Sequence, residues 1–395
     1  MEQAIDRLLK EESSAFYVFD TAVLRERIAY LRRHLPERAA LCYAVKANPF
    51  IVRELKGAVE RFEICSPGET EICMKAGIDP EEMVISGVYK TPSVTEELVR
   101  GGFTGVKTAE SLTQYRQLCE LSEKYSCRIK VLPRLTNGSQ FGMDAEDIEN
   151  IIASLPEHPG IEITGIQYFS GTQKTSLKRF GRELEQLDRF MGELKERHGF
   201  EAKYLEYGTG FPVAYFEGEE LDEDTLLDGF TELVNSMEFK GELILELGRS
   251  IAASCGRYFT HIVDIKRCKG VDYALVDGGM HQLVYFGQYM AMKKPLFSVA
   301  GKSEIIPGKQ WTVCGALCSM NDIIVKQAEL PEIETGDVLC FENAGAYCMT
   351  EGISLLLSRD LPAVYIVKED GSAVRVRRTF ETRQLNTPKY EIEGE

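Results

Sequence analysis

The sequence predicts an α/β protein in which a (β/α)8 barrel, of the TIM-barrel type, precedes a domain built from strands alone. Three observations support this fold class. Over about the first 250 residues, short apolar runs alternate with longer amphipathic segments, which is the rhythm of parallel strands joined by helices. From about residue 255, closely spaced short strands replace that rhythm. A chain of 395 residues is also too long for one small core, so we expect two domains.

The strands of the barrel are expected at regular intervals. Phe16–Asp20 (FYVFD) predicts a short strand after a polar leader helix, and the next segment, TAVLRERIAYLRRHL, has apolar positions at helical spacing. Stretches such as SLTQYRQLCELSEKY separate the later strands and are long enough for right-handed crossover helices. An open doubly wound sheet would show the same alternation, so that alternative stays open. We expect the eight barrel strands at residues 41–47, 62–66, 82–88, 105–109, 128–135, 163–170, 203–211 and 242–248.

The carboxyl-terminal part predicts a separate all-β domain. We place the boundaries at residues 1–22 for an amino-terminal segment, 23–254 for the barrel and 255–395 for the β domain. The acidic tail EIEGE (391–395) predicts disorder. The strands of the β domain are expected at residues 258–267, 272–278, 311–318, 337–345, 362–370 and 373–380.

Composition and charge exclude several function classes. A formal net charge of −16 gives no support to binding of nucleic acid or an anionic membrane, both of which need a basic face, so small-molecule chemistry is the better expectation. The amino terminus carries charges where a signal peptide needs an apolar core, and no run of roughly 18 apolar residues occurs. We therefore expect a cytoplasmic protein. The 11 cysteines include no CxxC pair, which indicates neither a disulfide framework nor a metal site.

One lysine directly follows the first barrel strand. Lys46 ends the apolar run of LCYAVKANPF and precedes a turn with Asn48 and Pro49. Catalytic groups of such barrels come from the carboxyl ends of the strands. A lysine in a partly dry pocket there can have its pKa lowered, and a neutral amine can form a Schiff base. A solvated lysine at a strand end is the structural alternative.

Other strand ends carry groups that suit an anion. Gly208, Thr209 and Gly210 predict a tight turn whose backbone N–H groups can bind a phosphate. Thr172 and Arg249 could add a hydroxyl and a positive charge. Two-glycine turns also occur for structural reasons, and the third position of a dinucleotide fingerprint is absent. A Schiff-base lysine with a compact phosphate site suggests pyridoxal 5′-phosphate (PLP).

Glu246, in the eighth predicted strand, has a physical role in a PLP site. PLP withdraws electrons most strongly when its pyridine nitrogen is protonated, and an adjacent carboxylate keeps it so. The structural alternative is a salt bridge between Glu246 and Arg249.

Eight motifs along the chain resemble those of the fold type III PLP-dependent decarboxylases, the family of diaminopimelate, ornithine and arginine decarboxylases. The resemblance covers about residues 15–360. It implies an alanine racemase-like fold, in which the amino-terminal strand joins the β domain. In chain order the motifs are YAVKANP, FEICSPGE, RL…QFGM, SGTQ, LEYGTGFP, ELGRSIAASCG, CGALCSMND and GDVLCFENAGAY.

The resemblance implies a role for each matching residue. Lys46 would hold PLP as the internal aldimine, and Glu246 would face the pyridine nitrogen. Cys318 matches the cysteine that a second chain supplies across a homodimer interface and that protonates Cα after CO2 leaves, so each active site would need two chains. The residues matched to the phosphate are Gly208, Thr209, Gly210, Thr172, Arg249 and Tyr347. Those matched to positions that support the lysine and the cofactor are Glu63, Glu69 and Arg134.

The chain departs from the family pattern at several positions. Phe169 stands where the family commonly has a histidine stacked on the pyridine ring, with Gln167 two residues earlier. Ser319 follows the family cysteine, where ornithine-type enzymes have an aspartate and diaminopimelate-type enzymes a glutamate. Near Tyr285, uncharged residues replace the arginine that reads a distal carboxylate. His281, which contacts the substrate or packs a loop, lies in a GGMHQ…FGQ pattern that looks more like family members acting on carrier-linked amino-acyl groups.

The resemblance therefore implies a PLP-dependent amino-acid decarboxylase similar to diaminopimelate decarboxylase. The substrate amine would displace Lys46, and the α-carboxylate would leave from the external aldimine. A racemase on the same fold is one alternative, although such racemases usually place an arginine where this chain has Glu246. A non-catalytic regulatory homologue is another, although it would tend to lose the cofactor ligands. The sequence leaves open whether the substrate is a free diamino or basic amino acid or a carrier-linked aminoacyl group, and which stereochemistry applies at Cα.

Overall fold

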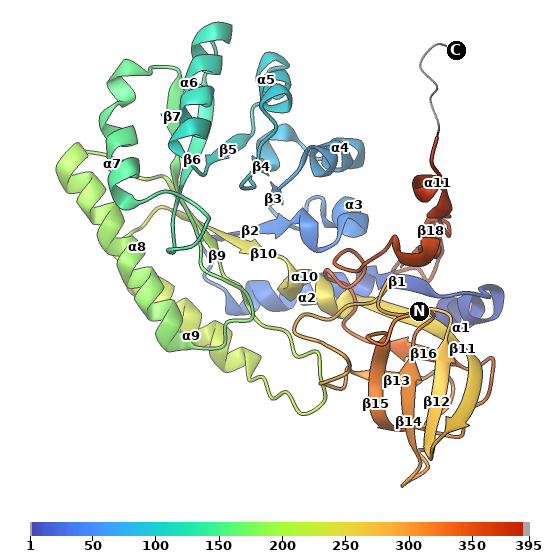
Figure 1. Ribbon diagram of the computed structural model, residues 1–395. Helices are drawn as coiled ribbons and strands as arrows, with labels where there is room; N and C mark the ends of the chain where they lie inside the picture. The colour runs from blue at the N-terminus through green and yellow to red at the C-terminus, as the bar shows by residue number, and fades with distance from the viewer. Residues whose placement is uncertain (1, 390–395) are drawn as a thin grey trace, which may run out of the picture. The chain divides into compact units, whose positions relative to one another are not determined.

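The computed structural model of the protein describes residues 2–389, which divide into two compact units (Figure 1). The barrel unit comprises Arg27–Val213 and Leu221–Ile251. The β unit comprises the described residues up to Glu26, Ala214–Glu220 and the chain from Ala252 onward. The acidic tail, for which the sequence predicts disorder, lies outside the described residues.

Eight parallel strands of the described chain close into a barrel. β10 pairs with β2 and β5 pairs with β6, so the ring has no open edge between them. A short additional strand, β7 (Ile161–Ile163), pairs with β6. The predicted barrel is confirmed, and the open doubly wound sheet is excluded. In order around the ring the strands are β2 (Ala39–Ala44), β3 (Arg61–Ile64), β4 (Met83–Ile85), β5 (Val106–Ala109), β6 (Ile129–Leu135), β8 (Gly165–Phe169), β9 (Tyr204–Gly208) and β10 (Glu242–Leu247).

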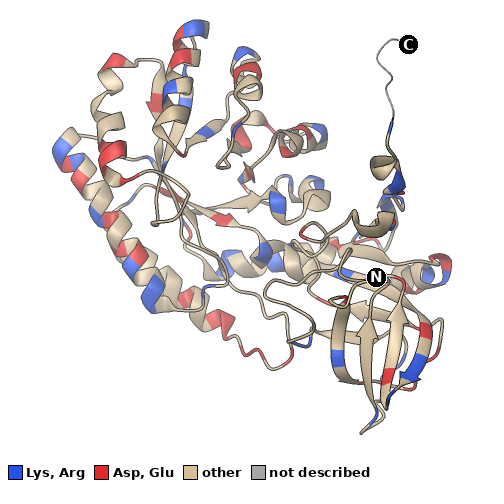
Figure 2. Cartoon of the chain, viewed as in Figure 1, with Lys and Arg blue, Asp and Glu red and all other residues tan. Residues whose placement is uncertain are grey.

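Helices alternate with the barrel strands, and local signals set their ends. α4 begins after Ser66, whose side chain accepts a hydrogen bond from Glu69 N at 3.2 Å, and it stops at Gly77, which has φ +76°. Charges of both signs lie along the long α8, whereas the barrel strands carry fewer (Figure 2). The helices are α2 (Thr21–His34), α3 (Val52–Leu55), α4 (Pro67–Ala76), α5 (Pro92–Arg100), α6 (Leu112–Tyr125), α7 (Ala145–Ala153), α8 (Leu177–His198), α9 (Glu223–Ser236) and α10 (Arg249–Ala252).

The β unit is built on the amino-terminal strand. β1 (Phe16–Asp20) runs antiparallel to β11 and parallel to β17, and its five residues are all buried. It joins the carboxyl-terminal sheet, as the resemblance implied. Helix α1 (Glu2–Glu11) contributes Ile5 and Leu8 to the same core. The other elements are β11 (Gly256–Cys268), β12 (Val271–Val276), β13 (Phe297–Val299), β14 (Gln310–Cys314), β15 (Ile323–Glu329), β16 (Val338–Phe341), β17 (Ala363–Val367), β18 (Ala373–Arg377) and α11 (Arg383–Asn386).

The structure differs from the expected elements in several places, which include the unpredicted strands β7, β13 and β15 and strands that end earlier than expected. β2 stops at Ala44, two residues before Lys46. β9 stops at Gly208, because Gly210 has φ +59° and cannot continue an extended strand. β15 was not predicted, since its pairing with β14 is irregular and its burial does not alternate with a period of two. Within residues 2–389, no helix combines the length and apolar character needed to cross a membrane.

Candidate active site

Lys46 lies just beyond the carboxyl end of β2, in the short turn Val45–Ala47. Both of its neighbours are buried, whereas the Lys46 side chain is 41% exposed. Asn48 fixes the chain after the turn: its side chain accepts a hydrogen bond from Phe50 N at 3.0 Å, and its carbonyl accepts one from the Tyr43 hydroxyl at 3.0 Å. A rigid turn thus presents the amine at the end of the barrel where functional groups of this fold gather.

Glu63, in β3, is the partner of Lys46. The amine and Glu63 Oε2 form an ion pair in which the carboxylate is almost closed to solvent. Burial acts to raise the pKa of Glu63, but the charge of the ammonium and its hydrogen bond prevail and hold that pKa below its usual value. Cys65 Sγ lies 3.5 Å from the amine, and burial raises the pKa of the thiol. Glu69 accepts a hydrogen bond from Cys65 N at 2.7 Å, so it supports the turn beneath the amine.

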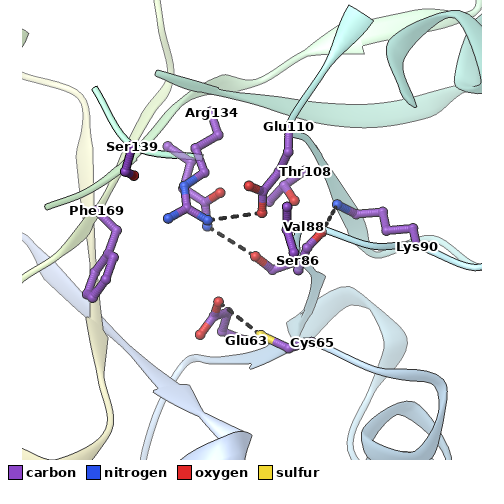
Figure 3. A network of polar contacts seen from close by, with 12 residues as sticks. Glu63, Cys65, Ser86, Val88, Lys90, Thr108, Glu110, Arg134, Ser139 and Phe169 are labelled. Atoms are coloured by element: carbon purple, nitrogen blue, oxygen red, sulfur yellow. Dashed lines mark hydrogen bonds and ion pairs between the residues drawn. The ribbon is translucent and has the colours of Figure 1, made fainter. Parts of the chain in front are cut away.

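A second ion pair lies at the neighbouring strand ends (Figure 3). Arg134, in β6, donates to Glu110 Oε1 at 3.0 Å, and both side chains are nearly buried. The guanidinium carbon of Arg134 lies 5.9 Å from the ring centre of Phe169. Lys90 donates to Gly87 O at 2.8 Å in the same region, and burial lowers its pKa to about 8. Each of these two positive charges is held by a protein partner, and that of Arg134 lies near the ring of Phe169 (Figure 3).

Two glycine turns lie against each other at the ends of β8 and β9. A Cβ added to Gly210 would lie 2.0 Å from Gly171 O, and the φ of +59° at Gly210 also disfavours any side chain. Lys174 N donates to Gly210 O at 2.9 Å and joins the two turns. A Cβ added to Gly208 would lie 2.2 Å from the Phe169 ring. Bare backbone is therefore required at these positions, as in a cradle for an anion.

A cation and hydroxyls flank this glycine cradle. Arg249 Nε donates to Thr172 Oγ1 at 3.0 Å, and the Arg249 side chain is buried. Thr209 is also buried, and its hydroxyl donates to Glu246 O at 3.4 Å. A phosphate needs backbone donors, a hydroxyl and a positive charge close together, and this part of the barrel supplies them.

Glu246, in β10, is bound to a neutral amide and a second acid. Gln167 Nε2 donates to Glu246 Oε1 at 2.6 Å and to Glu206 Oε1 at 2.9 Å. Burial and the charge of Glu63 raise the pKa of Glu246, although hydrogen bonds from Glu206 and Gln167 act against that rise. Burial, followed by the charge of Glu246, raises the pKa of Glu206 far above its usual value.

Three of the predicted residues in the β unit lie in loops. Tyr347 has a left-handed backbone, with φ +65°. Cys318 is an exposed free cysteine. Ser319 Oγ accepts a hydrogen bond from Asn321 N at 3.2 Å, which orders the turn that follows Cys318.

Two others are buried within the β unit. The Tyr285 hydroxyl donates to Glu342 O at 2.5 Å. His281 is 1% exposed, and neither ring nitrogen has a hydrogen-bond partner among the described residues. It lines a cavity with Asp277 and Arg359, and burial, with a smaller effect of the Arg359 charge, lowers its pKa to about 4.

The structure brings most of the predicted barrel residues together and adds partners that sequence reasoning missed. Glu110 was missed, although GVKTAE places a carboxylate directly after a predicted strand. Glu206 was missed because LEYGTGFP was used only for its glycines. Lys174 has no sequence signal, since a lysine after SGTQ suggests a solvated loop. The residues brought together in the barrel are Lys46, Glu63, Arg134, Phe169, Thr172, Gly208, Thr209, Gly210, Glu246 and Arg249.

Comparison with known proteins identifies the relatives of this chain. Residues 21–260 match the family described as "Pyridoxal-dependent decarboxylase, pyridoxal binding domain". The L-glutamyl-BtrI acyl-carrier protein decarboxylase of Niallia circulans is 26% identical over 96% of this chain and 94% of its own. The diaminopimelate decarboxylase of Aquifex aeolicus is 26% identical over 97% and 94%. The crystal structure of diaminopimelate decarboxylase from Helicobacter pylori with L-lysine has the same fold, with a TM-score of 0.85 and 22% identity over 96% of this chain and 98% of that one.

Proposed function

The chain belongs to the family of pyridoxal-dependent decarboxylases, and we propose that Lys46 holds the cofactor at the barrel site where the α-carboxylate of an amino-acid substrate is removed. The protein is a PLP-dependent carboxy-lyase. One observation carries the assignment of the site. β2 lies between β3 and β10, so the exposed amine that follows it is flanked by strands bearing Glu63 and Glu246.

The barrel residues fit PLP in both shape and charge. The glycine cradle leaves no room for a Cβ at Gly210 and keeps its backbone bare for the phosphate. Arg249 and Thr172 would add a charge and a hydroxyl to that phosphate. Glu246 would face the pyridine nitrogen, and Phe169 would take the place of the ring-stacking histidine.

The chain's own residues would do three things in the reaction. When bound, PLP supplies a conjugated ring that accepts the electron pair released as CO2 departs. Lys46 would bind the cofactor aldehyde through Nζ, give way to the substrate amine, and remain close to the site through its ion pair with Glu63. Glu246 would keep the proton on the pyridine nitrogen. Cys318 Sγ, from a second copy of the chain, would return a proton to Cα.

We propose that the active form is a homodimer with shared sites. The exposure of Cys318 and of the neighbouring Met320, which is 87% exposed, supports an interface at this loop. We also propose that the protein acts in the cytoplasm, because its 11 cysteines are free thiols in the structure, which suits a reducing compartment.

A substrate without a charged distal group fits the described residues best. The Tyr285 hydroxyl donates its hydrogen bond to Glu342 O, and the Ser319 hydroxyl accepts one from Asn321 N in the same turn. Neither position offers the charge that would bind a distal carboxylate or ammonium. A carrier-linked aminoacyl group is therefore the preferred substrate class, ahead of diaminopimelate.

Two alternatives lack this support. Racemases of this fold usually place an arginine where this chain has Glu246, which keeps the pyridine nitrogen unprotonated. A non-catalytic regulatory homologue would tend to lose the cofactor ligands, whereas this chain has Lys46, the glycine cradle and Glu246.

The test is CO2 release by protein purified with PLP, offered free L- and D-amino acids and aminoacyl groups loaded on a carrier. Lys46→Ala should lower turnover by roughly a thousandfold or more and abolish the covalent cofactor adduct trapped with borohydride. Lys75→Ala, an exposed lysine of α4, is the matched control and should behave as wild type. Exchange of the Cα hydrogen without CO2 release would indicate the racemase, and a Lys46→Ala protein with unchanged turnover would remove Lys46 from the mechanism.

A further inference from the structure

Gln167, Glu206 and Glu246 form a closed polar cluster on three consecutive barrel strands. Gln167 stands directly opposite Glu206 in the β8–β9 pair, and β10 follows β9. Gln167 and Glu206 are 1% and 0% exposed, and Glu246 is 9% exposed. One amide group donates to both carboxyls, so the two acids are held side by side. The cluster forms the buried side of the site proposed above.

The cluster contains two acids but no cation. Among the described residues, neither Glu206 nor Glu246 forms an ion pair. Glu206 Oε2 is shut off from solvent and accepts no hydrogen bond from any described group. An ionised oxygen there would have neither a protein donor nor a counter-ion, and two adjacent buried carboxylates would also repel each other.

The other ionisable groups that face the pair do not remove this charge problem. Glu63 adds a third negative charge, and Lys46 is already bound to it. Cys42 of β2 is a buried thiol whose pKa is raised by burial. The positive charge of Arg61 does not neutralise the pair, because its guanidinium lies 3.8 Å from Glu242 and over the ring of Tyr204.

We propose that Glu206 is a positioning residue that keeps its proton at neutral pH and donates it in a hydrogen bond to Glu246, so that Glu246 is the one ionised acid of the cluster. The more deeply buried acid carries the proton, and the acid with residual exposure carries the charge. Glu206 and Gln167 together give Glu246 two donors, which fix its rotamer and keep it ionised. The functional role of this proton rests on the proposed function, because an ionised Glu246 would hold the pyridine nitrogen of PLP protonated.

Infrared spectroscopy of the PLP-loaded protein tests the proton directly. At about pH 8, wild-type protein should show the C=O stretch of a buried carboxylic acid, shifted in D2O and by 13C labelling of glutamate. The band should vanish in Glu206→Gln and remain in Glu246→Gln. Absence of the band in wild type, or its persistence in Glu206→Gln, would overturn the inference.

Kinetics separate positioning from a purely structural role. Glu206→Gln keeps a donor and should stay within about threefold of wild-type kcat. Glu206→Met removes the donor and should lower kcat by about tenfold or more, with a smaller effect on KM, and move the acid limb of the kcat profile to higher pH. Equal losses in the two variants, without a shift in the pH profile, would contradict the proposal.

The two proposals fail in different ways. If the protein shows the band but releases CO2 from no substrate, the proposed function is refuted, whereas the inference that Glu206 is protonated stands. An active decarboxylase without the band would refute the inference alone.

Discussion

Lys174 Nζ lies 2.9 Å from Glu183 Oε2 in an ion pair whose lysine side chain is closed to solvent. The same amine donates to Ser170 Oγ and to Tyr207 Oη, each at 3.0 Å. Ser170 follows β8, Tyr207 lies in β9 and Glu183 lies in α8, so one buried amine joins three elements beside the glycine cradle. Such a buried group helps to hold the cradle in place.

Replacing Lys174 by Met should therefore weaken both the fold and the cradle. Glu183 would keep only Arg179 as a cationic partner, and the free energy of unfolding should fall by about 3 kcal/mol. Affinity for PLP should fall by about tenfold, because the two glycine turns lose a common anchor. Denaturant unfolding and fluorescence titration with PLP measure the two effects. Lys178→Met, an exposed lysine in the first turn of α8, is the control and should change neither quantity.

The stability difference between wild type and Lys174→Met should depend on pH. Burial lowers the pKa of Lys174 to about 8, although Glu183 acts in the opposite direction. The folded protein thus releases this proton near pH 8, whereas the unfolded chain keeps it until about pH 10.4. Because the unfolded chain binds more protons in that window, wild type should gain stability relative to Lys174→Met as pH rises from about 8 to about 10, by up to ~1.4 kcal/mol per pH unit. A stability difference that stays flat across this range would contradict the buried position of the amine.

The sequence was sufficient for the fold and for residues placed by strand ends. Lys46 follows an apolar run and Glu246 lies near the end of another. Because the carboxyl ends of all strands meet on one face of a parallel barrel, the alternation of strand-like and helical segments predicts that the two residues lie close together. Gly210 was predictable for a similar reason, since few other residues tolerate its backbone conformation.

The partners of these residues were not predictable from the sequence. Gln167, Glu206 and Glu246 belong to strands separated by about 40 residues each, and only the pairing of those strands makes them neighbours. Lys174 is buried because α8 and the end of β9 cover it, which no local pattern reports. Sequence patterns thus predict which residues face the site, whereas the pairing of acids with donors and cations depends on tertiary contacts.

The cradle predicts opposite effects for two glycine substitutions. Gly210→Ala should cost about 3 kcal/mol of stability and weaken PLP binding by more than about tenfold, because its Cβ meets the backbone of Gly171 and its φ is left-handed. Gly192→Ala is the matched control in the middle of α8, where an added Cβ meets nothing within 4 Å. It should stabilise the protein by about 0.5 to 1 kcal/mol and leave PLP binding unchanged. Thermal unfolding and PLP titration of both variants decide the matter, and a tolerated alanine at position 210 would show that the cradle is not tightly packed.

His281 predicts an acid-sensitive stability in the β unit. Its pKa is lowered to about 4, first by burial and then by Arg359, whereas in the unfolded chain it titrates near about 6.5. As pH falls from about 6.5 to about 4, the unfolded chain takes up a proton that the folded protein excludes, so stability is lost on acidification. His281→Asn keeps a polar side chain but cannot bind that proton, and it should become more stable than wild type by about 2 kcal/mol at pH 4, relative to their difference at pH 7. This figure allows for screening by solvent that enters the cavity beside the ring.

Denaturant unfolding of wild type and His281→Asn between pH 4 and pH 7 gives the comparison. Glu304→Gln, on the exposed surface of the same unit, is a control for general effects of acid. If the His281→Asn difference is the same at pH 4 and pH 7, the imidazole is charged in the folded state and must have an anionic neighbour closer to it than Asp277.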